Sequence, residues 1–451
     1  MALGGGTFLF QNKILPGAYI NFISKDRPIA TFADRGFAAI PIDLDWGPED
    51  EVFSVGSSDF QKDTTLYFGY DYTHDKMKPL RDLFLHLQTG HFYRLNSGGV
   101  KATAAIGTAK YSGVRGNDLK VVVSASLDEE NMFSVVTYLG TVIVDRQSVA
   151  TMADIVDSDY IVFKKDWTIE ATAGMPLTGG TNGTISGEAY QTFLDLIEKK
   201  YFNILICPST ESTIKSLFVT YTKRMRDDVG IKFQLVGHKI TTADYEGVIS
   251  VYNDVLDDGA AVSSLVYWVG GAEAGAAIGF SGGTSYISLT NMTYDGEYKV
   301  DTNMKQSELE KQRVLGQLLF HEVGKRVSGE YVQFVRVLED VNTFTTFIPA
   351  KNNDFANNGV IRTLDQIAID IATLFNESFL GKVQNDAIGR ASFKSNIVFH
   401  HRELERVRAL QNFNPDDVIV EKGTDKGAVL VTDPVEPVGV MDRLYMQVIV
   451  A

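Results

Sequence analysis

The sequence predicts a multidomain α/β protein with an inserted antiparallel β module and an extended, strand-like arm at each end. Three observations lead to this prediction. At 451 residues the chain is too long for one small hydrophobic core. Helical and strand patterns alternate on either side of a stretch of short β-rich runs. The first and last segments read as extended chain with no obvious partner nearby.

The N-terminal segment 7–23, "TFLFQNKILPGAYINFI", reads as two short extended pieces broken at Pro16-Gly17. Termini are usually frayed unless something ties them down, and an apolar arm would be unfavourable in water. The apolar side chains expected to act in this arm are Phe8, Phe10, Ile14 and Ile20.

An α/β pattern follows the arm. Residues 37–42, "FAAIPI", predict a buried strand, and apolar residues spaced three and four apart from Met77 to Leu87 predict a helix. Residues 91–95, "HFYRL", predict a second strand. This piece is therefore expected to belong to an α/β body.

The predicted secondary structure changes from alternating helices and strands to strands alone between residues 101 and 177. The runs "DLKVVVSASL", "MFSVVTYLG", "TVIVDR" and "DYIVFKK" are short, β-rich and separated by turn residues. They predict a small antiparallel β module, which ends at the flexible junction "TGGTNGTISG", residues 178–187.

Helices and strands alternate again from residue 190, which predicts a largely parallel sheet covered by helices. A third helix is predicted to open with the capping box Ser307-x-x-Glu310. The strand pair 317–322 and 330–338 is expected to follow it.

The C-terminal part predicts two strong helices and a hairpin. Apolar stripes at helical spacing run over residues 361–379 and 393–407. Residues 417–423 and 428–433 read as the two strands of a hairpin.

The chain closes with "VGVMDRLYMQVIVA". Its side chains alternate, with Leu444, Met446, Val448 and Val450 on one face and Arg443, Tyr445, Gln447 and Ile449 on the other. Alternation of this kind predicts a strand, although no partner strand follows in the chain. The preceding "TDPVEPVG", residues 432–439, contains two prolines that favour extended chain and predict a stiff tether able to swing.

Composition and charge exclude some classes of function. A net charge of −15 argues against a nucleic-acid surface. The start of the chain shows no signal-peptide pattern, and the longest apolar stretch, 265–280, carries Glu273 and is shorter than a membrane span requires. Cys207 is the single cysteine, which rules out an internal disulfide, and we interpret it as a buried strand thiol.

Motifs that could carry chemistry are weak. Ser281 in "GFSGG" fits G-x-S-x-G, but a helix-like segment precedes it and a strand-like segment follows it, the reverse of a nucleophile elbow. His400 and His401 point to different faces of a predicted helix, so we expect core or interface histidines rather than metal ligands. No phosphate-binding loop occurs. We therefore expect no catalytic residue, cofactor or metal; the alternative left open is a cytoplasmic α/β serine hydrolase with a degenerate elbow at Ser281.

The order of segments resembles the tail sheath proteins of contractile-tailed phages and phage-derived particles, over nearly the full length of the chain. The stretches that carry the resemblance are "LPGAYINF" (15–22), "DWGP" (45–48), "KYSGVRGNDLKVVV" (110–123), "LTGGTNG" (177–183), "VIRTLDQIAIDIATLFNESFLGKVQN" (360–385) and the C-terminal strand.

The resemblance implies a structural polymer rather than an enzyme. Its subunits would stack as six-fold rings around a tail tube, with N- and C-terminal arms extending the sheets of neighbouring subunits, and would also meet baseplate and tail terminator proteins. It would assemble in the host cytoplasm and reside in the tail of a virion or phage-derived particle. A different structural component of the same tail is the other alternative.

The resemblance also implies a division of the chain, with a subtilisin-like but non-catalytic body and an outward-facing β insertion. The expected parts are the N-terminal arm 1–28, the discontinuous body 29–100 with 178–345, the β-sandwich-like insertion 101–177, the C-terminal helix-plus-sheet domain 346–437 and the C-terminal strand arm 438–451.

A basic cluster lies in the part that the resemblance places innermost. Its members are Lys382, Arg390, Lys394, Arg402, Arg406 and Arg408. We expect Lys382, Arg390 and Lys394 to contact acidic groups on the tube. The alternative is a solvated helix face that pairs with Glu403 and Glu405 or with other subunits.

Overall fold

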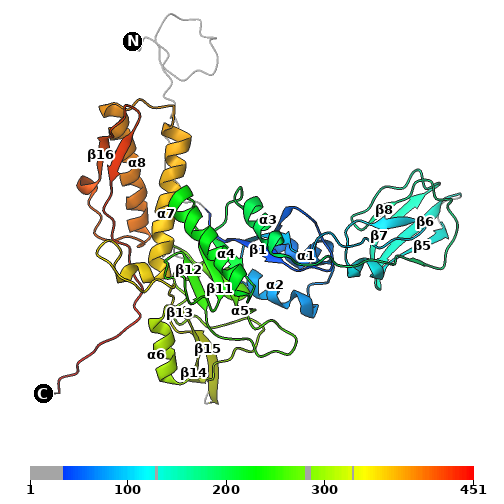
Figure 1. Cartoon of the computed structure of the whole chain (residues 1–451), viewed down its shortest axis with the longest axis horizontal. Coiled ribbons are helices and arrows are strands. Elements are labelled where there is room, and N and C mark those ends of the chain that lie inside the picture. The colour runs from blue at the N-terminus through cyan, green and yellow to red at the C-terminus, as the bar shows by residue number, and fades with distance from the viewer. Residues whose placement is uncertain (1–33, 127–130, 280–285, 328–329, 451) are drawn as a thin grey trace, which may run out of the picture.

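The computed structural model describes residues 34–126, 131–279, 286–327 and 330–450. A central α/β body has a β-rich module at one end of the long axis and a tall unit of helices with a hairpin at the other (Figure 1). The C-terminal arm leaves from the base of the tall unit and points away from it. The predicted multidomain α/β architecture is confirmed.

The central sheet has the strand order β13-β12-β11-β10-β1-β3-β2 among the described residues. Its strands are β1 (Phe37–Ile42), β2 (Val52–Gly56), β3 (Thr89–Arg94), β10 (Ile204–Cys207), β11 (Gln234–His238), β12 (Val248–Val251) and β13 (Gln317–Leu318). Neighbours pair in parallel, except that β2 is antiparallel to β3. Strands such as β10 are buried on both faces, which explains their continuous apolar runs.

Successive residues of a strand face opposite layers of helices. Ile204 and Ile206 belong to the core under one layer, and Leu205 and Cys207 belong to the core under the other. The first layer contains α1 (Ser57–Phe68), α2 (Lys78–Phe84) and α5 (Leu265–Gly275); the second contains α3 (Gly187–Ile197) and α4 (Ser212–Lys223), which continues as a π-helical turn (Arg224–Val229).

The β module lies between β3 and α3 in the chain, and the predicted strands are present. Its sheets have the orders β7-β6-β5-β9 and β4-β8. The strands are β4 (Gly107–Ala109), β5 (Leu119–Ala125), β6 (Phe133–Leu139), β7 (Val142–Val149), β8 (Ile161–Phe163) and β9 (Met175–Pro176). Trp46 of the body enters the core of the module, where its ring stacks 6.0 Å from that of Tyr160.

The hairpin β14 (Phe320–Val327) and β15 (Glu330–Val337) follows α6 (Gln306–Val314). The predicted capping box at the start of α6 is wrong, because Lys305 is the N-cap residue and Ser307 already lies inside the helix. The Glu310 side chain instead accepts a hydrogen bond from Gln306 Nε2 at 2.9 Å. The strand-like segment that follows Ser281 in the sequence is not a strand where the structure describes it: residues 286–290 form a loop, in which Leu289 N–H donates to the Asp340 carboxylate at 3.0 Å.

The tall unit contains the two predicted helices and the predicted hairpin. They are α7 (Asn358–Leu374) with its π-helical turn (Phe375–Phe379), α8 (Ala387–Arg406), and the antiparallel strands β16 (Ile419–Lys422) and β17 (Val429–Thr432). Short 3₁₀ turns elsewhere cover Asp75–Met77, Val114–Asp118, Asn353–Ala356 and Pro415–Asp417. Asn357 and Asp386 cap the starts of α7 and α8 with their side chains.

A buried polar cluster joins α7 to the body. Arg362 Nη2 donates to Glu273 Oε2 of α5 at 2.6 Å and to Asp340 Oδ2 at 3.3 Å. Arg226 makes a bidentate pair with Asp365 at 2.6 and 2.8 Å. Breaking a buried pair leaves an uncompensated charge, so this cluster holds the base of the tall unit firmly against the body.

Candidate functional site

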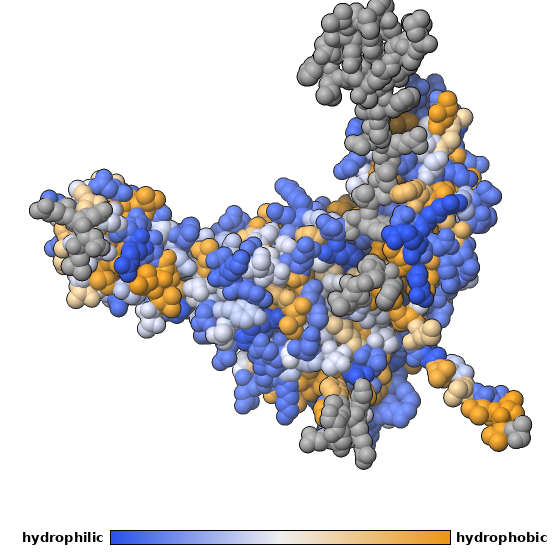
Figure 2. All heavy atoms as spheres, turned by 180° about the vertical axis from the view of Figure 1, so that it is seen from behind, coloured by the Kyte–Doolittle hydropathy of each residue, from blue (hydrophilic) through white to orange (hydrophobic). Residues whose placement is uncertain are grey.

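The C-terminal arm is the most exposed apolar segment of the described chain. Residues 439–450 are extended, with no helix or strand assigned. Leu444 is 84% exposed and Val450 91%, and Met446 and Val448 are exposed as well. Figure 2 shows the arm as a thin, largely hydrophobic extension clear of the body. No strand of the described residues pairs with it, so its backbone groups and apolar side chains are open to another molecule. The strand itself stays a prediction, because no described residue pairs with it.

The root of the arm is fixed, which corrects the prediction of a swinging tether over residues 432–439. Val438 N–H donates to Ala409 O at 2.9 Å, and Gln411 N–H donates to Glu436 O at 3.0 Å. The Glu436 carboxylate also accepts from Gln411 Nε2 at 2.6 Å and from Asn412 Nδ2 at 2.9 Å. The prolines do favour extended chain, but the residues beside them pair with the loop after α8. The free arm therefore begins at residue 439.

A second contact holds the arm further along. Arg443 Nη2 lies 3.1 and 3.2 Å from the two carboxylate oxygens of Glu339, just after β15. Glu339 is also bound by Arg313 of α6 at 2.5 and 2.6 Å. Burial raises the pKa of the Glu339 carboxyl, but the hydrogen bonds and charges of Arg313 and Arg443 outweigh it and hold the pKa below its ordinary value. The sequence pattern did not signal this contact, because Glu339 precedes Arg443 by 104 residues.

The hairpin β16–β17 offers a matching surface. Its Val420, Val429 and Val431 pack against the cluster between α7 and α8. Ile419 and Leu430 are exposed. Within the described ranges neither strand has a second neighbour. An isolated two-stranded sheet is marginally stable, and an open strand edge is a template for pairing with another chain.

The predicted arm residues Phe8, Phe10, Ile14 and Ile20 lie outside the described residues.

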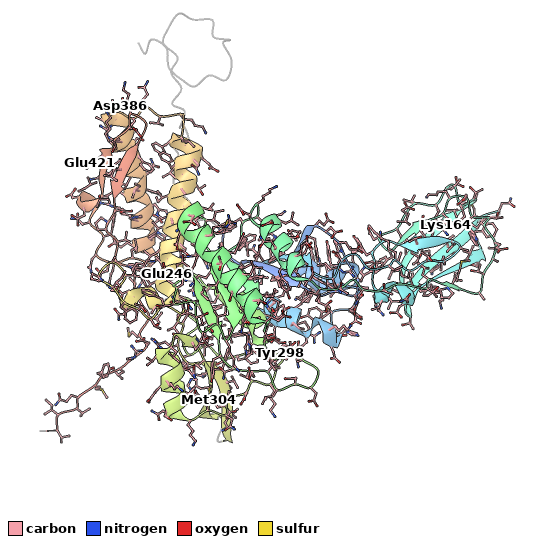
Figure 3. All side chains as sticks on the ribbon, in the orientation of Figure 1. Lys164, Glu246, Tyr298, Met304, Asp386 and Glu421 are labelled. Carbon is pink, nitrogen blue, oxygen red and sulfur yellow. The ribbon has the colours of Figure 1, made fainter. Side chains whose placement is uncertain are left out.

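The predicted tube-contact residues lie at the far end of the tall unit, near Asp386 (Figure 3). Lys382 is exposed, and its ammonium donates to Glu377 O. Arg390 is half-buried and donates from Nη1 to Asn385 O at 3.1 Å and to Asn385 Oδ1 at 3.0 Å. Lys394 lies one turn further along α8, half-exposed. Of the remaining basic residues, Arg406 pairs with Glu403 at 2.7 Å at the other end of the helix.

The surface around these basic residues is partly apolar. A cavity of about 380 Å³ opens beside Arg390 and is lined by Phe379, Phe393 and Lys426, among others. Leu380 and Val383 are exposed in the turn that leads to α8, and Ile388 is exposed at the start of α8. The charges found among the lining residues, Arg390 and Lys426, are both positive. The patch thus combines positive charge with apolar side chains, a mixture that the charge pattern alone did not predict.

The described residues that were considered for catalysis or metal binding show no reactive arrangement. Ser281 lies outside the described residues. Cys207 is buried at the end of β10, where burial raises the pKa of its thiol to about 12, so it carries no thiolate near neutral pH. No group of three or more His, Cys, Asp or Glu side chains in the described part of the chain could hold a metal ion. Across the same residues, no helix is long and apolar enough to cross a membrane.

The two adjacent histidines are buried, as predicted, but they do meet. His400 Nδ1 lies 3.1 Å from His401 Nδ1, so the expectation that the two rings diverge is wrong. His400 Nε2 lies 2.9 Å from Asp370 Oδ2 on α7, and His401 Nε2 lies 2.7 Å from Asp433 Oδ2. The pair thus links both helices to the segment that leads into the arm.

Family models for phage tail sheath proteins match most of the chain. The beta-sandwich domain model matches residues 97–182, the central domain model 183–343 and the C-terminal domain model 350–451.

Individual relatives agree with these matches. A sheath tail protein from Desulfitobacterium hafniense is 31% identical, and its crystal structure has a TM-score of 0.80 over 96% of this chain and 99% of that one. The phage-like element PBSX protein XkdK of Bacillus subtilis (strain 168) is 28% identical over 481 residues, which cover 99% of each chain. The helical sheath of the anti-feeding prophage in its contracted state has a TM-score of 0.58 over 97% of this chain and 99% of that one, and at 12% identity it shows a likeness of fold alone.

Proposed function

The chain belongs to the phage tail sheath protein family, and on this premise we propose that it polymerises as stacked six-fold rings around a tail tube and contracts to drive that tube through the host cell envelope. A structural role in a phage tail or phage-derived particle follows from the family itself. Ring stacking, contraction, assembly in the host cytoplasm and contacts with the baseplate and tail terminator belong to the proposal.

The exposed C-terminal arm is the observation that carries the proposal. Residues 444–450 would add as a strand to the hairpin β16–β17 of another subunit, whose strand edges are open within the described residues. The N-terminal arm with Phe8, Phe10, Ile14 and Ile20 would add a second link of the same kind.

The energies suit a link that is repeated many times. Each backbone hydrogen bond contributes on the order of 1 kcal/mol net, and each buried apolar side chain adds roughly 1.5–3 kcal/mol. Association and the ordering of the arm cost about 4 kcal/mol or more in return. One link is therefore only moderately strong, but links around every subunit would keep the lattice connected while its rings slide and rotate.

The proposed division of labour uses the observed sheets. The body, 29–100 with 178–345, would be a subtilisin-like, non-catalytic unit, which is supported by the parallel sheet that β1 and β3 share with β10 to β13. The insertion 101–177 would face outward, and the domain 346–437 would lie innermost. The buried pairs of Arg362 and Arg226 support movement of the body and the innermost domain as one unit.

The tube contact is proposed at the far end of the tall unit. Lys382, Arg390 and Lys394, with the exposed turn between α7 and α8, would meet acidic and apolar groups on the tube. Polar contacts are weakened by salt and can be released during contraction, whereas a wholly apolar seal would resist sliding.

Deletion of residues 441–451 tests the proposal. The deleted residues that the structure describes are exposed, so the subunit should remain folded and soluble. It should fail to form tubes or rings visible by negative-stain microscopy at concentrations where the full chain forms them. Normal polymers from the truncated chain, or loss of its circular dichroism spectrum, would contradict strand donation.

A further inference from the structure

Arg443 is held in a socket on the body of its own subunit. The guanidinium of Arg443 binds the carboxylate of Glu339, which follows β15 in the chain. Arg313 of α6 binds the same carboxylate. The socket forms one wall of a cavity of about 500 Å³ to which Asp442 and Arg443 themselves contribute. The Glu339 side chain is 13% exposed and that of Arg443 54%, so the carboxylate is built into the body while the arginine comes to it from solvent.

The socket does not cover the apolar residues at the end of the arm. Leu444, Met446, Val448 and Val450 are all exposed beyond it. A contact that stored the arm would bury these side chains, and this one leaves them in solvent. It therefore sets where the arm starts and which way it points.

Direction matters because the subunit carries its own open hairpin. The free arm begins at residue 439, and the twelve residues to Val450 can span about 40 Å when extended. The helix α8, against which β16 packs, has 20 residues and is about 30 Å long. An unrestrained arm could thus fold back along its own helix and occupy its own hairpin.

The socket shortens and redirects that reach. Once Arg443 is bound at Glu339, only residues 444–450 remain free, and they span about 25 Å from a point on the body. Figure 3 shows the arm leaving the base of the tall unit, at the end opposite Glu421 of the hairpin.

We propose that the Glu339–Arg313 socket is a binding site for Arg443 of the same chain, which keeps the arm off its own hairpin and so favours donation of the strand to a second copy. This inference rests on the proposed strand donation. Because it concerns the free subunit, it can be tested apart from assembly.

The test measures the position of the arm in the free subunit. The native Cys207 is buried, so spin labels can be placed on Val448→Cys and Glu421→Cys and their separation measured by pulsed electron paramagnetic resonance. Labelled protein is diluted into unlabelled protein below the concentration of assembly. We expect a long, narrow distance distribution in the parent, and a broader one with an added short population in the Arg443→Gln variant. Arg406→Gln, which removes an exposed arginine paired within α8, is the matched control and should resemble the parent.

Assembly supplies the second measurement. Loss of the socket contact should raise the concentration needed for half-maximal polymer roughly two- to five-fold, as expected for a partly exposed ion pair. Arg443→Lys should recover part of this, because the charge is kept while the forked geometry is lost.

An Arg443→Gln distribution identical to the parent would overturn the inference, and so would broadening without a short population, since no self-pairing would then need preventing. Failure of the proposed function looks different: the chain lacking residues 441–451 would still polymerise, whatever the spin labels report.

Discussion

Replacing Arg362 by methionine should destabilise the protein far more than replacing Glu273 by glutamine, although the two side chains are bonded to each other in the buried cluster. Arg362 is buried with Glu273 and Asp340, so one cation faces two carboxyl groups. Burial, followed by the charge of Asp340, raises the pKa of Glu273 well above its ordinary value. Burial also opposes the charge on Asp340, but the Arg362 charge and several hydrogen bonds outweigh it and lower that pKa. The environment therefore favours the neutral form of Glu273 and the charged form of Asp340.

The sizes of the effects follow from this assignment. Arg362→Met leaves a buried carboxylate without its cation and should cost about 3–5 kcal/mol of stability. Glu273→Gln keeps an oxygen that can accept from Arg362 at a position where burial favours the neutral side chain, and should cost less than about 1 kcal/mol. Arg224→Met, the matched control, removes a solvent-exposed pair with Glu198 and should cost about 0–1 kcal/mol.

Urea unfolding followed by tryptophan fluorescence would measure these costs, because the buried Trp268 lies in the same helix as Glu273. The pH dependence adds a sign. Because folding raises the pKa of Glu273 above its ordinary value of 4.5, the folded chain holds this proton to a higher pH than the unfolded chain does. The contribution of Glu273 to the free energy of unfolding should therefore fall as pH rises above about 4.5, so the difference in stability between the parent and Glu273→Gln should shift in favour of the variant over that range. Equal damage from Glu273→Gln and Arg362→Met, or a silent Arg362→Met, would refute the assignment.

Other predictions concern assembly and the absence of chemistry. Because Val448 is exposed, Val448→Asp should leave the subunit folded but weaken each strand link by roughly 1.5–3 kcal/mol, about ten- to hundred-fold in affinity. Gln447→Asp, on the other face of the strand, should weaken the link less. Equal effects of the two variants in a sedimentation assay of polymer formation would contradict the alternation. Reversing Arg390 and Lys394 to Glu should impair assembly on tubes at low salt while tube-free polymer still forms, and normal co-assembly would exclude this patch as the tube contact. Ser281→Ala should change neither assembly nor the result of a hydrolase assay. A fluorophosphonate probe that labels the parent at Ser281 but not the variant would contradict this prediction.

Local patterns predicted the elements whose apolar residues are dense and periodic. The stripes of α7 and α8, the hairpin β16–β17 and the strands β5 to β8 of the β module appear as expected, whereas the short strands β4 and β9 of that module were not predicted. Three body elements were not predicted. The helix α1 buries Phe60, Thr64 and Phe68, so a polar residue interrupts its stripe, and β2 and β12 are too short to show a period.

Contacts between distant segments could not be predicted from local patterns. The alternation of apolar and polar side chains predicted the arm. Its attachment, however, depends on the contact of Glu436 with Gln411 and on that of Arg443 with Glu339. Both attachments join side chains far apart in the sequence, and nothing in the local pattern marks one as the partner of the other. Glu273 did stand out as a charge within an apolar stretch, but its role appears only when α7 brings Arg362 to it.

The most direct test of strand donation is a cryo-electron microscopy map of the assembled polymer in which residues 439–450 can be traced. We expect residues 444–450 of each subunit to run as a strand beside β16 or β17 of a different subunit, with backbone hydrogen bonds along the pair. A map in which the arm lies on the hairpin of its own subunit, or in which the hairpins gain no strand from a neighbour, would contradict the account.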